Sequence, residues 1–199
     1  LIPVFATVLA TVVLGERLSA QIVAAFALIF AGIAIVWITA PSVAAGAEGA
    51  WGGAARTTGR VLAVVSAASY GGSYVARKLG IAGLPDPLLG TAIGACAGIT
   101  FYCLAALVSR EFAAQLAAVR RRPTGWQLAA ASGISIGQIL LFFALVYAGV
   151  ATVAIIASVE MFFAAWLAGV VFRTERRPGW TFALASGLAF GGVAFLVLA

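Results

Sequence analysis

Histidine is absent from this chain of 199 residues, which contains only two cysteines and six acidic residues. Without histidine it cannot form the Ser-His or Cys-His pairs of nucleophilic enzymes, His-ligated haem or most catalytic zinc sites. Charged residues make up 9% of the chain, whereas 64% of it is hydrophobic. A soluble domain of this length cannot bury so much apolar surface. The composition therefore predicts a protein whose solvent is lipid.

The two cysteines, Cys96 and Cys103, lie in one apolar segment. Two side chains at this spacing on one helix do not easily reach the geometry of a disulfide, so we expect them to pack as small apolar groups. No metal site and no cofactor are predicted. The lack of paired carboxylates, like the lack of histidine, argues against an intramembrane enzyme.

Basic residues outnumber acidic ones, and the formal net charge is +6. In a soluble protein this excess would favour a nucleic-acid partner. Here the arginines fall almost entirely between apolar segments, where membrane topology and lipid headgroups explain them better. We therefore expect a lipid bilayer as a partner and no nucleic acid.

Apolar segments of about the length that spans a bilayer recur along the chain. They predict an all-α polytopic bundle of seven visible helices, over residues 1–14, 20–38, 61–76, 88–108, 126–147, 151–172 and about 179–199. Residues 40–60 are predicted to form a loop, 110–123 a basic amphipathic connector and 173–178 a short polar turn. Because the chain begins inside an apolar run, we expect it to be a fragment that lacks preceding helices.

One phrase occurs twice in the sequence. The first copy reads Pro3-Val4-Phe5-Ala6, an apolar run and Gly15-Glu16-Arg17, and the second reads Glu160-Met161-Phe162-Phe163-Ala164, an apolar run and Arg173-Thr174-Glu175-Arg176. Each copy is followed by an apolar helix with a similar ending, GIAIV at 32–36 and GVAFL at 192–196. Such a long repeat of hydrophobic helices predicts an internally duplicated membrane protein, and transporters are the commonest class of this kind.

Glycines recur at helical spacing in three of the predicted spans. They are Gly90, Gly94 and Gly98, then Gly133 and Gly137, and finally Gly187 and Gly191. In lipid no hydrophobic force drives helices together, so rows of small residues that allow close backbone approach hold a bundle together. We interpret these rows as packing surfaces. The alternative is that they are sliding surfaces of a moving bundle.

Polar side chains share one face of the predicted helix 61–76. They are Ser66, Ser69, Tyr70, Ser73 and Tyr74. This stripe is costly against lipid and should face the bundle interior, either in hydrogen bonds between helices or as the wall of a polar substrate cavity. Ser135 and Gln138 lie one turn apart in the helix 126–147, where the carboxamide of Gln138 can both donate and accept hydrogen bonds.

Glu160 is the tenth residue of the predicted span 151–172, so its carboxyl group lies near the middle of an apolar helix. An ionised carboxylate there costs about 3 kcal/mol on insertion scales. Every arginine and lysine lies near a predicted helix end, so no basic partner is available within a span. We expect Glu160 to couple proton movement to transport or to contact a substrate amine. The alternative is a neutral carboxyl group bonded to a neighbouring helix.

These residues together resemble the drug/metabolite transporter (DMT) superfamily, specifically its EamA-domain proteins. The likeness is carried by residues 69–79, 142–145, 149–151 and 160–165, and by Gly15-Glu16-Arg17, which matches the Gly-Glu-Arg turn of the family. Thr174-Glu175-Arg176 is similar to that turn. One position departs from the family pattern, since Met161 replaces a usual proline that Pro3 keeps in the first copy. One position differs between the two copies, since Ile2 stands where the second copy has Glu160.

The resemblance implies ten helices in two inverted five-helix repeats. Residues 1–39 would hold the last two helices of the first repeat, 40–60 the loop between repeats and 61–199 the second repeat. It implies a permease or exporter in a cell membrane, such as a bacterial inner membrane, that moves small metabolites, amino acids or drug-like solutes by alternating access. The candidate cavity residues are Ser66, Tyr70, Ser73, Tyr74, Ser135, Gln138 and Glu160, with protons as a possible coupling ion at Glu160. A non-transporting scaffold or sensor with the same fold is the alternative.

The distribution of basic residues and the resemblance give opposite membrane orientations. One side of the predicted bundle carries Arg17, Arg77 and Lys78, and the other carries Arg56, Arg60, Arg110, Arg120, Arg121, Arg122, Arg173, Arg176 and Arg177. The positive-inside rule places the larger set in the cytoplasm. The resemblance, with cytoplasmic termini in the full form, implies the reverse. Cysteine-accessibility labelling at Arg120 distinguishes the two.

Overall fold

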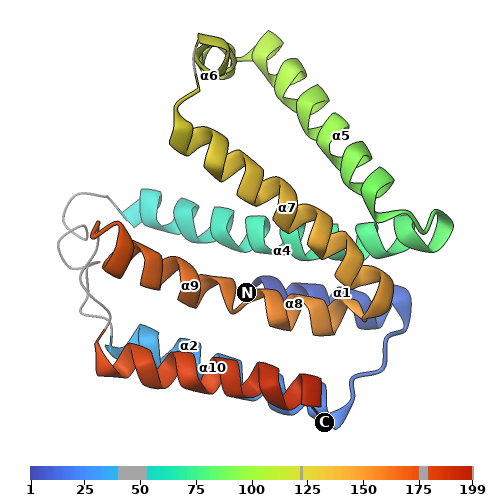
Figure 1. Cartoon of the computed structure of the whole chain (residues 1–199), viewed down its shortest axis with the longest axis vertical. Helices are drawn as coiled ribbons and strands as arrows, with labels where there is room; N and C mark the ends of the chain where they lie inside the picture. The colour runs from blue at the N-terminus through green and yellow to red at the C-terminus, as the bar shows by residue number, and fades with distance from the viewer. Residues whose placement is uncertain (40–52, 122, 175–178, 199) are drawn as a thin grey trace. The chain divides into compact units, whose positions relative to one another are not determined.

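The computed structural model describes residues 1–39, 53–121, 123–174 and 179–198, and within these ranges every element is a helix (Figure 1). The helices are α1 (Ile2–Leu14), α2 (Ala20–Thr39), α4 (Gly53–Gly83), α5 (Pro87–Val108), α6 (Arg110–Arg121), α7 (Gly125–Tyr147), α8 (Val150–Ala157), α9 (Glu160–Trp166) and α10 (Trp180–Leu198). A π-helical turn, Leu167–Val171, continues α9. The all-α class predicted from the sequence is confirmed.

Four helical stretches among the described residues are long and apolar enough to cross a membrane. They are Pro87–Val108, Gly125–Tyr147, Val150–Val171 and Trp180–Leu198. Two further apolar helices, Ile2–Leu14 and Ala20–Val36, are shorter. Helix α4 is long but carries the polar stripe and several basic residues. The chain thus has the helices of a membrane protein, while the count of seven spans stays a prediction.

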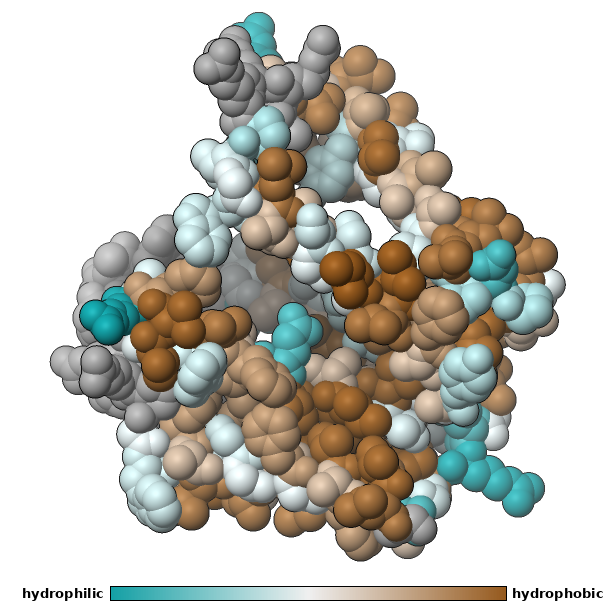
Figure 2. Space-filling view, viewed as in Figure 1, coloured by the Kyte–Doolittle hydropathy of each residue, from teal (hydrophilic) through white to brown (hydrophobic). Residues whose placement is uncertain are grey.

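Large apolar side chains are exposed along these helices, and they cover much of the face shown in Figure 2. Helix α5 has no buried residue, and near its end Leu107 and Val108 are 83% and 90% exposed. A soluble protein rarely exposes so large a contiguous apolar surface. Such a surface is suited to contact with lipid acyl chains.

Packing divides the chain into two compact units. Unit 1 comprises Leu1–Val75 and Gly149–Ala199, and unit 2 comprises Ala76–Ala148. Unit 1 thus joins the first helices of the chain to the last ones. The sequence predicts another division, in which the loop 40–60 separates two duplicated repeats. That division stays a prediction.

Helices α2 and α10 form the closest pair in unit 1 and lie side by side (Figure 1). A Cβ atom built on Gly32 would stand 2.6 Å from the carbonyl oxygen of Ala185, and one built on Gly192 would stand 3.1 Å from that of Ala25. Since the end of each helix meets the early part of the other, the pair is antiparallel. A side chain at Gly32 would collide with the partner backbone, and one at Gly192 would press tightly against it, so the two glycines allow the close approach of the helices.

The two copies of the repeated phrase end in the same backbone conformation. Gly15 is left-handed, with φ of 66°, and the N–H of Glu16 donates to the carbonyl of Ala10 over 3.3 Å. Arg173 is left-handed as well, with φ of 54°, and the N–H of Thr174 donates to the carbonyl of Ala168 over 3.0 Å. These are Schellman-type helix ends, in which a left-handed residue and a six-to-one hydrogen bond satisfy the last carbonyls.

Glu16, from the first copy of the phrase, caps the N-terminus of α8. Its two carboxylate oxygens accept hydrogen bonds from the N–H groups of Val150, over 2.8 Å, and Ala151, over 3.2 Å. A Cβ atom on Gly149 would stand 3.0 Å from this carboxylate, so glycine leaves room for the contact. A carboxylate here satisfies free N–H groups and complements the positive end of the helix dipole.

One segment differs from the sequence prediction. Helix α4 begins at Gly53, inside the predicted loop 40–60, where alanines and arginines of 53–60 favour a helix. The predicted amphipathic connector 110–123 is largely helical as α6. The predicted span 151–172 is found as one apolar helical stretch, Val150–Val171, with a tightened turn at Ser158 and Val159. Residues 40–52 of the predicted loop and 175–178 of the predicted turn, including Glu175 and Arg176, lie outside the described residues.

Candidate functional site

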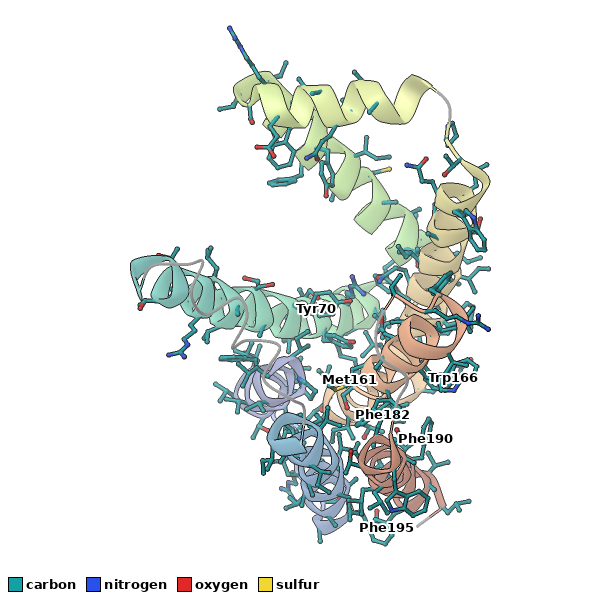
Figure 3. All side chains as sticks on the ribbon, turned by 90° about the vertical axis from the view of Figure 1, so that its left-hand side faces the viewer. Tyr70, Met161, Trp166, Phe182, Phe190 and Phe195 are labelled. Carbon is teal, nitrogen blue, oxygen red and sulfur yellow. The ribbon has the colours of Figure 1, made fainter. Side chains whose placement is uncertain are left out.

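A cavity of about 450 Å³ in unit 1 brings together three of the predicted site residues, Tyr70, Tyr74 and Glu160. It is lined by Leu1, Ile2, Pro3, Phe30, Ile33, Tyr70, Tyr74, Ala154, Ala157, Ser158, Glu160 and Met161. Figure 3 shows Tyr70 on α4 and Met161 on α9 among these lining side chains. The wall is apolar apart from the tyrosines, Ser158 and Glu160, which is typical of a small-molecule site with few polar groups.

The two tyrosines enter the cavity from adjacent turns of α4. Their ring centroids are 5.8 Å apart with the planes tilted by 59°, and Tyr74 is buried while Tyr70 is exposed. Gly71 places them there, because a Cβ atom on it would stand 2.8 Å from the backbone nitrogen of Ala6 in α1. Both rings offer π-faces to the cavity, and Tyr70 is the more exposed of the two.

Glu160 stands at the first position of α9, directly after a tightened turn of the span. At this turn the hydrogen bonds shorten to a three-residue spacing, with the N–H of Val159 donating to the carbonyl of Ile156 and that of Phe162 to the carbonyl of Val159. Ser158 and Val159 keep right-handed helical dihedral angles, and the hydroxyl of Ser158 donates to the carbonyl of Ile155 over 2.6 Å. The turn therefore changes the helical spacing without ending the helical stretch Val150–Val171.

Among the described residues, the carboxyl group of Glu160 has no basic partner. Glu160 is exposed, and within the described ranges no ion pair or hydrogen bond to its carboxylate is found. Ile2, its sequence-predicted equivalent in the first copy of the phrase, lines the same cavity. The two copies therefore contribute one ionisable and one aliphatic side chain to one site.

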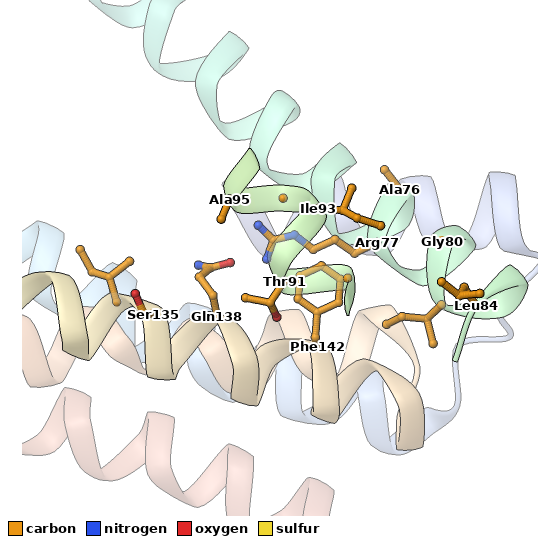
Figure 4. A pocket seen from close by; sticks show the side chains of 14 residues that line it. Ala76, Arg77, Gly80, Leu84, Thr91, Ile93, Ala95, Ser135, Gln138 and Phe142 are labelled. Carbon is orange, nitrogen blue, oxygen red and sulfur yellow. The ribbon is translucent and has the colours of Figure 1, made fainter. Parts of the chain in front are cut away.

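Ser135 and Gln138 lie elsewhere. They line a second cavity, of about 590 Å³, inside unit 2, together with Arg77, Thr91 and Phe142 (Figure 4). Ser66 and Ser73 line neither cavity. The hydroxyl of Ser73 donates to the carbonyl of Tyr70 over 2.7 Å, and Ser66 is exposed on α4. The structure thus divides the predicted residues between two sites.

The predicted glycine rows lie mostly on open surfaces. Gly90 approaches another helix, since a Cβ atom on it would stand 2.7 Å from Cε1 of Phe142. For six others, such a Cβ meets no neighbouring atom of the described residues within 4 Å: Gly94, Gly98, Gly133, Gly137, Gly187 and Gly191. The close backbone approaches in unit 1 fall instead at Gly32, Gly71 and Gly192. A role of the open glycines in packing stays a prediction.

Arg77 is a candidate binding residue that the sequence analysis placed among helix-end charges. Helix α4 continues to Gly83, so Arg77 lies more than one turn before the helix end and lines the cavity of unit 2. The sequence signal for it is the adjacent pair Arg77 and Lys78. Neighbouring residues of a helix do not share a face, so the two cations must meet different surroundings. Among the described residues, no group of three or more His, Cys, Asp or Glu side chains is placed to hold a metal ion.

Comparison with known proteins gives no relative. No family model, no curated protein and no solved structure matches the chain.

Proposed function

We propose that this chain is part of a secondary transporter that moves a small metabolite, amino acid or drug-like solute by alternating access, as its resemblance to EamA-domain proteins of the DMT superfamily implies. The observation that carries the proposal is Glu160. Among the described residues this carboxyl group has no basic partner, and it lines a cavity beside a tightened turn of one apolar helical stretch of membrane-spanning length. Ionisable groups within membrane spans that face a cavity are typical of transport pathways and proton relays.

The pairing of α2 with α10 supports the inverted repeats of the proposal. Counting back from the matching endings at 32–36 and 192–196, Ala25 corresponds to Ala185 and Gly32 to Gly192. Gly32 contacts Ala185 and Gly192 contacts Ala25. Exchanging each residue for its equivalent in the other helix turns one contact into the other. A two-fold relation between antiparallel equivalent helices produces this reciprocity, as inverted-topology repeats do.

In this proposal Glu160 and the tyrosines bind the solute together. A protonated Glu160 is neutral and tolerates the apolar cavity, whereas the ionised form attracts a cationic group of the solute. The rings of Tyr70 and Tyr74 attract the same cationic group through their π-faces. Exchange of a proton for the solute at Glu160 would couple their movements in opposite directions.

A comparison of exported metabolites in cells tests the proposal. Cells that overexpress the wild-type chain, Glu160→Gln or Glu111→Gln are compared by mass spectrometry of the intracellular and extracellular pools. Glu111 is the matched control because it is an exposed carboxylate on α6. We expect the wild type and Glu111→Gln to shift the same solutes and Glu160→Gln to lose that shift. No shift by any of the three would favour a scaffold or sensor.

A further inference from the structure

The cavity of unit 2 is distinct from the proposed transport site, and its polar groups suit a ligand of another kind. It lies between the end of α4, the first turns of α5 and residues 134–142 of α7 (Figure 4). Most of its wall is apolar and includes Ile81, Leu84, Ile93, Ile134 and Phe142. At about 590 Å³ it is large enough for a small organic molecule or part of a lipid.

Arg77 is the cationic group of this cavity. Its Nη1 atom is buried and has no hydrogen-bond partner among the described residues. The guanidinium carbon lies 5.2 Å from the centroid of the Phe142 ring, which holds the guanidinium group against an aromatic face. No acidic residue lines the cavity. A buried guanidinium N–H without an acceptor costs stability unless a ligand supplies one.

The neighbouring charged groups bind helix ends and do not neutralise Arg77. The ammonium group of Lys78 donates to the carbonyls of Leu145 and Ala148, over 2.6 and 2.9 Å, at the C-terminus of α7. The carboxylate of Asp86 accepts from the N–H groups of Leu88 and Leu89 at the N-terminus of α5. Of these three charged residues, only Arg77 lines the cavity.

Gln138 is the second available donor. Figure 4 shows its carboxamide with the oxygen on the side of Arg77 and the nitrogen on the far side. Its side chain forms no hydrogen bond with the part of the chain that the structure describes. The hydroxyls of Thr91 and Ser135 already donate to the carbonyls of Pro87 and Ala131, so they offer acceptors only. The free donors of the cavity therefore come from Arg77 and Gln138.

We propose that this cavity binds the oxyanion of an amphipathic molecule, a carboxylate or phosphate group joined to an apolar body. The guanidinium fork of Arg77 and the amide N–H of Gln138 would donate to the oxyanion, as charge-assisted pairs of this kind do. The apolar wall would hold the body. The same chemistry is offered by an anionic phospholipid of the bilayer and by a free aromatic or alkyl acid. This site does not depend on transport through the cavity of unit 1.

The test measures thermal unfolding of the purified full chain with two probes. Phenyl phosphate is titrated against the protein in detergent, with benzyl alcohol as its uncharged analogue. Separately, the protein is placed in nanodiscs of phosphatidylcholine alone or of phosphatidylcholine and phosphatidylglycerol in equal parts. The variants are Arg77→Gln and Gln138→Leu, and the control is Arg60→Gln, which removes an exposed arginine from the same helix.

We expect Arg77→Gln to weaken phenyl phosphate binding about tenfold or more, because it removes hydrogen bonds to a charged group. Gln138→Leu should weaken it less, and Arg60→Gln should not change it. A rise of the unfolding midpoint with phenyl phosphate identifies a free acid as a sufficient ligand, and a rise only with phosphatidylglycerol identifies the lipid. If neither probe stabilises the wild type more than Arg77→Gln, or more than Gln138→Leu where Arg77→Gln does not fold, the proposal is wrong.

Discussion

Ile2 of α1 and Glu160 of α9 line the same cavity, although the sequence places them at equivalent positions of a duplicated phrase. An inverted duplication brings equivalent positions together around a two-fold axis, so two such residues can share one site. The first copy contributes an aliphatic side chain and the second an ionisable one. The cavity is therefore chemically asymmetric, although the phrases that build it are related.

Moving the carboxylate across the cavity tests this relation. In the double variant Ile2→Glu with Glu160→Ile the acidic group stays in the cavity but enters from α1. We expect this variant to retain part of the pH-dependent transport, whereas Glu160→Ile alone loses it. Transport by both is measured in proteoliposomes at several external pH values. Equal loss in the single and double variants would show that the position of Glu160 matters beyond its place in the cavity.

The cap that Glu16 forms on α8 gives a prediction about stability. Glu16→Ala leaves the N–H groups of Val150 and Ala151 without their carboxylate acceptor. We expect the free energy of unfolding to fall by about 0.5–2 kcal/mol, the usual cost of a lost N-terminal cap. Thermal unfolding in detergent measures it, with Glu111→Ala as the control at an exposed position. An equal effect of the two substitutions would contradict the capping role.

The contact between α2 and α10 predicts opposite effects for two glycines. Gly32→Ala places a Cβ atom against the backbone of Ala185 and should destabilise the chain by about 1–3 kcal/mol through overpacking. Gly187→Ala, on the same helix pair, meets open space and should be neutral or stabilising by about 0.5–1 kcal/mol, because alanine favours a helix. Unfolding midpoints of the two variants decide. Destabilisation by Gly187→Ala would show that its surface is covered by another helix.

The left-handed helix ends also predict opposite effects for two substitutions. Gly15→Ala puts a side chain at φ of 66° and should cost about 1 kcal/mol. Arg173→Gly removes a side chain from a backbone with φ of 54°, which relieves a conformational strain of about 1–2 kcal/mol. Glycine also makes the unfolded chain more flexible, which costs about 0.4–1 kcal/mol on folding. We therefore expect a small gain in stability from Arg173→Gly, measured by chemical denaturation. A clear loss would mean that the arginine side chain stabilises this end.

The sequence predicts the helices well because apolar length and composition define them directly. It does not reveal which face of a helix meets which partner. The rows of Gly133 and Gly187 were interpreted as packing surfaces, whereas the contacts of unit 1 use Gly32 and Gly192, because glycine spacing alone does not distinguish a helix contact from a lipid-facing groove. Small residues serve both.

The candidate site was predictable in its residue types and less so in its grouping. Glu160 stood out as a carboxylate within an apolar span, and Tyr70 as part of a polar stripe. The division of these residues from Gln138 depends on how the helices pack, which periodicity does not encode. Arg77 was missed because its binding role depends on α4 extending to Gly83, a helix end without a strong sequence signal.

The most direct test of the account is proton movement in proteoliposomes. A pH-sensitive dye inside the vesicles reports whether addition of the solute identified in the export comparison moves protons. We predict a solute-dependent change of internal pH with the wild-type chain and with Glu111→Gln, and none with Glu160→Gln. A change of equal size with Glu160→Gln would contradict the central claim that Glu160 couples the solute to protons.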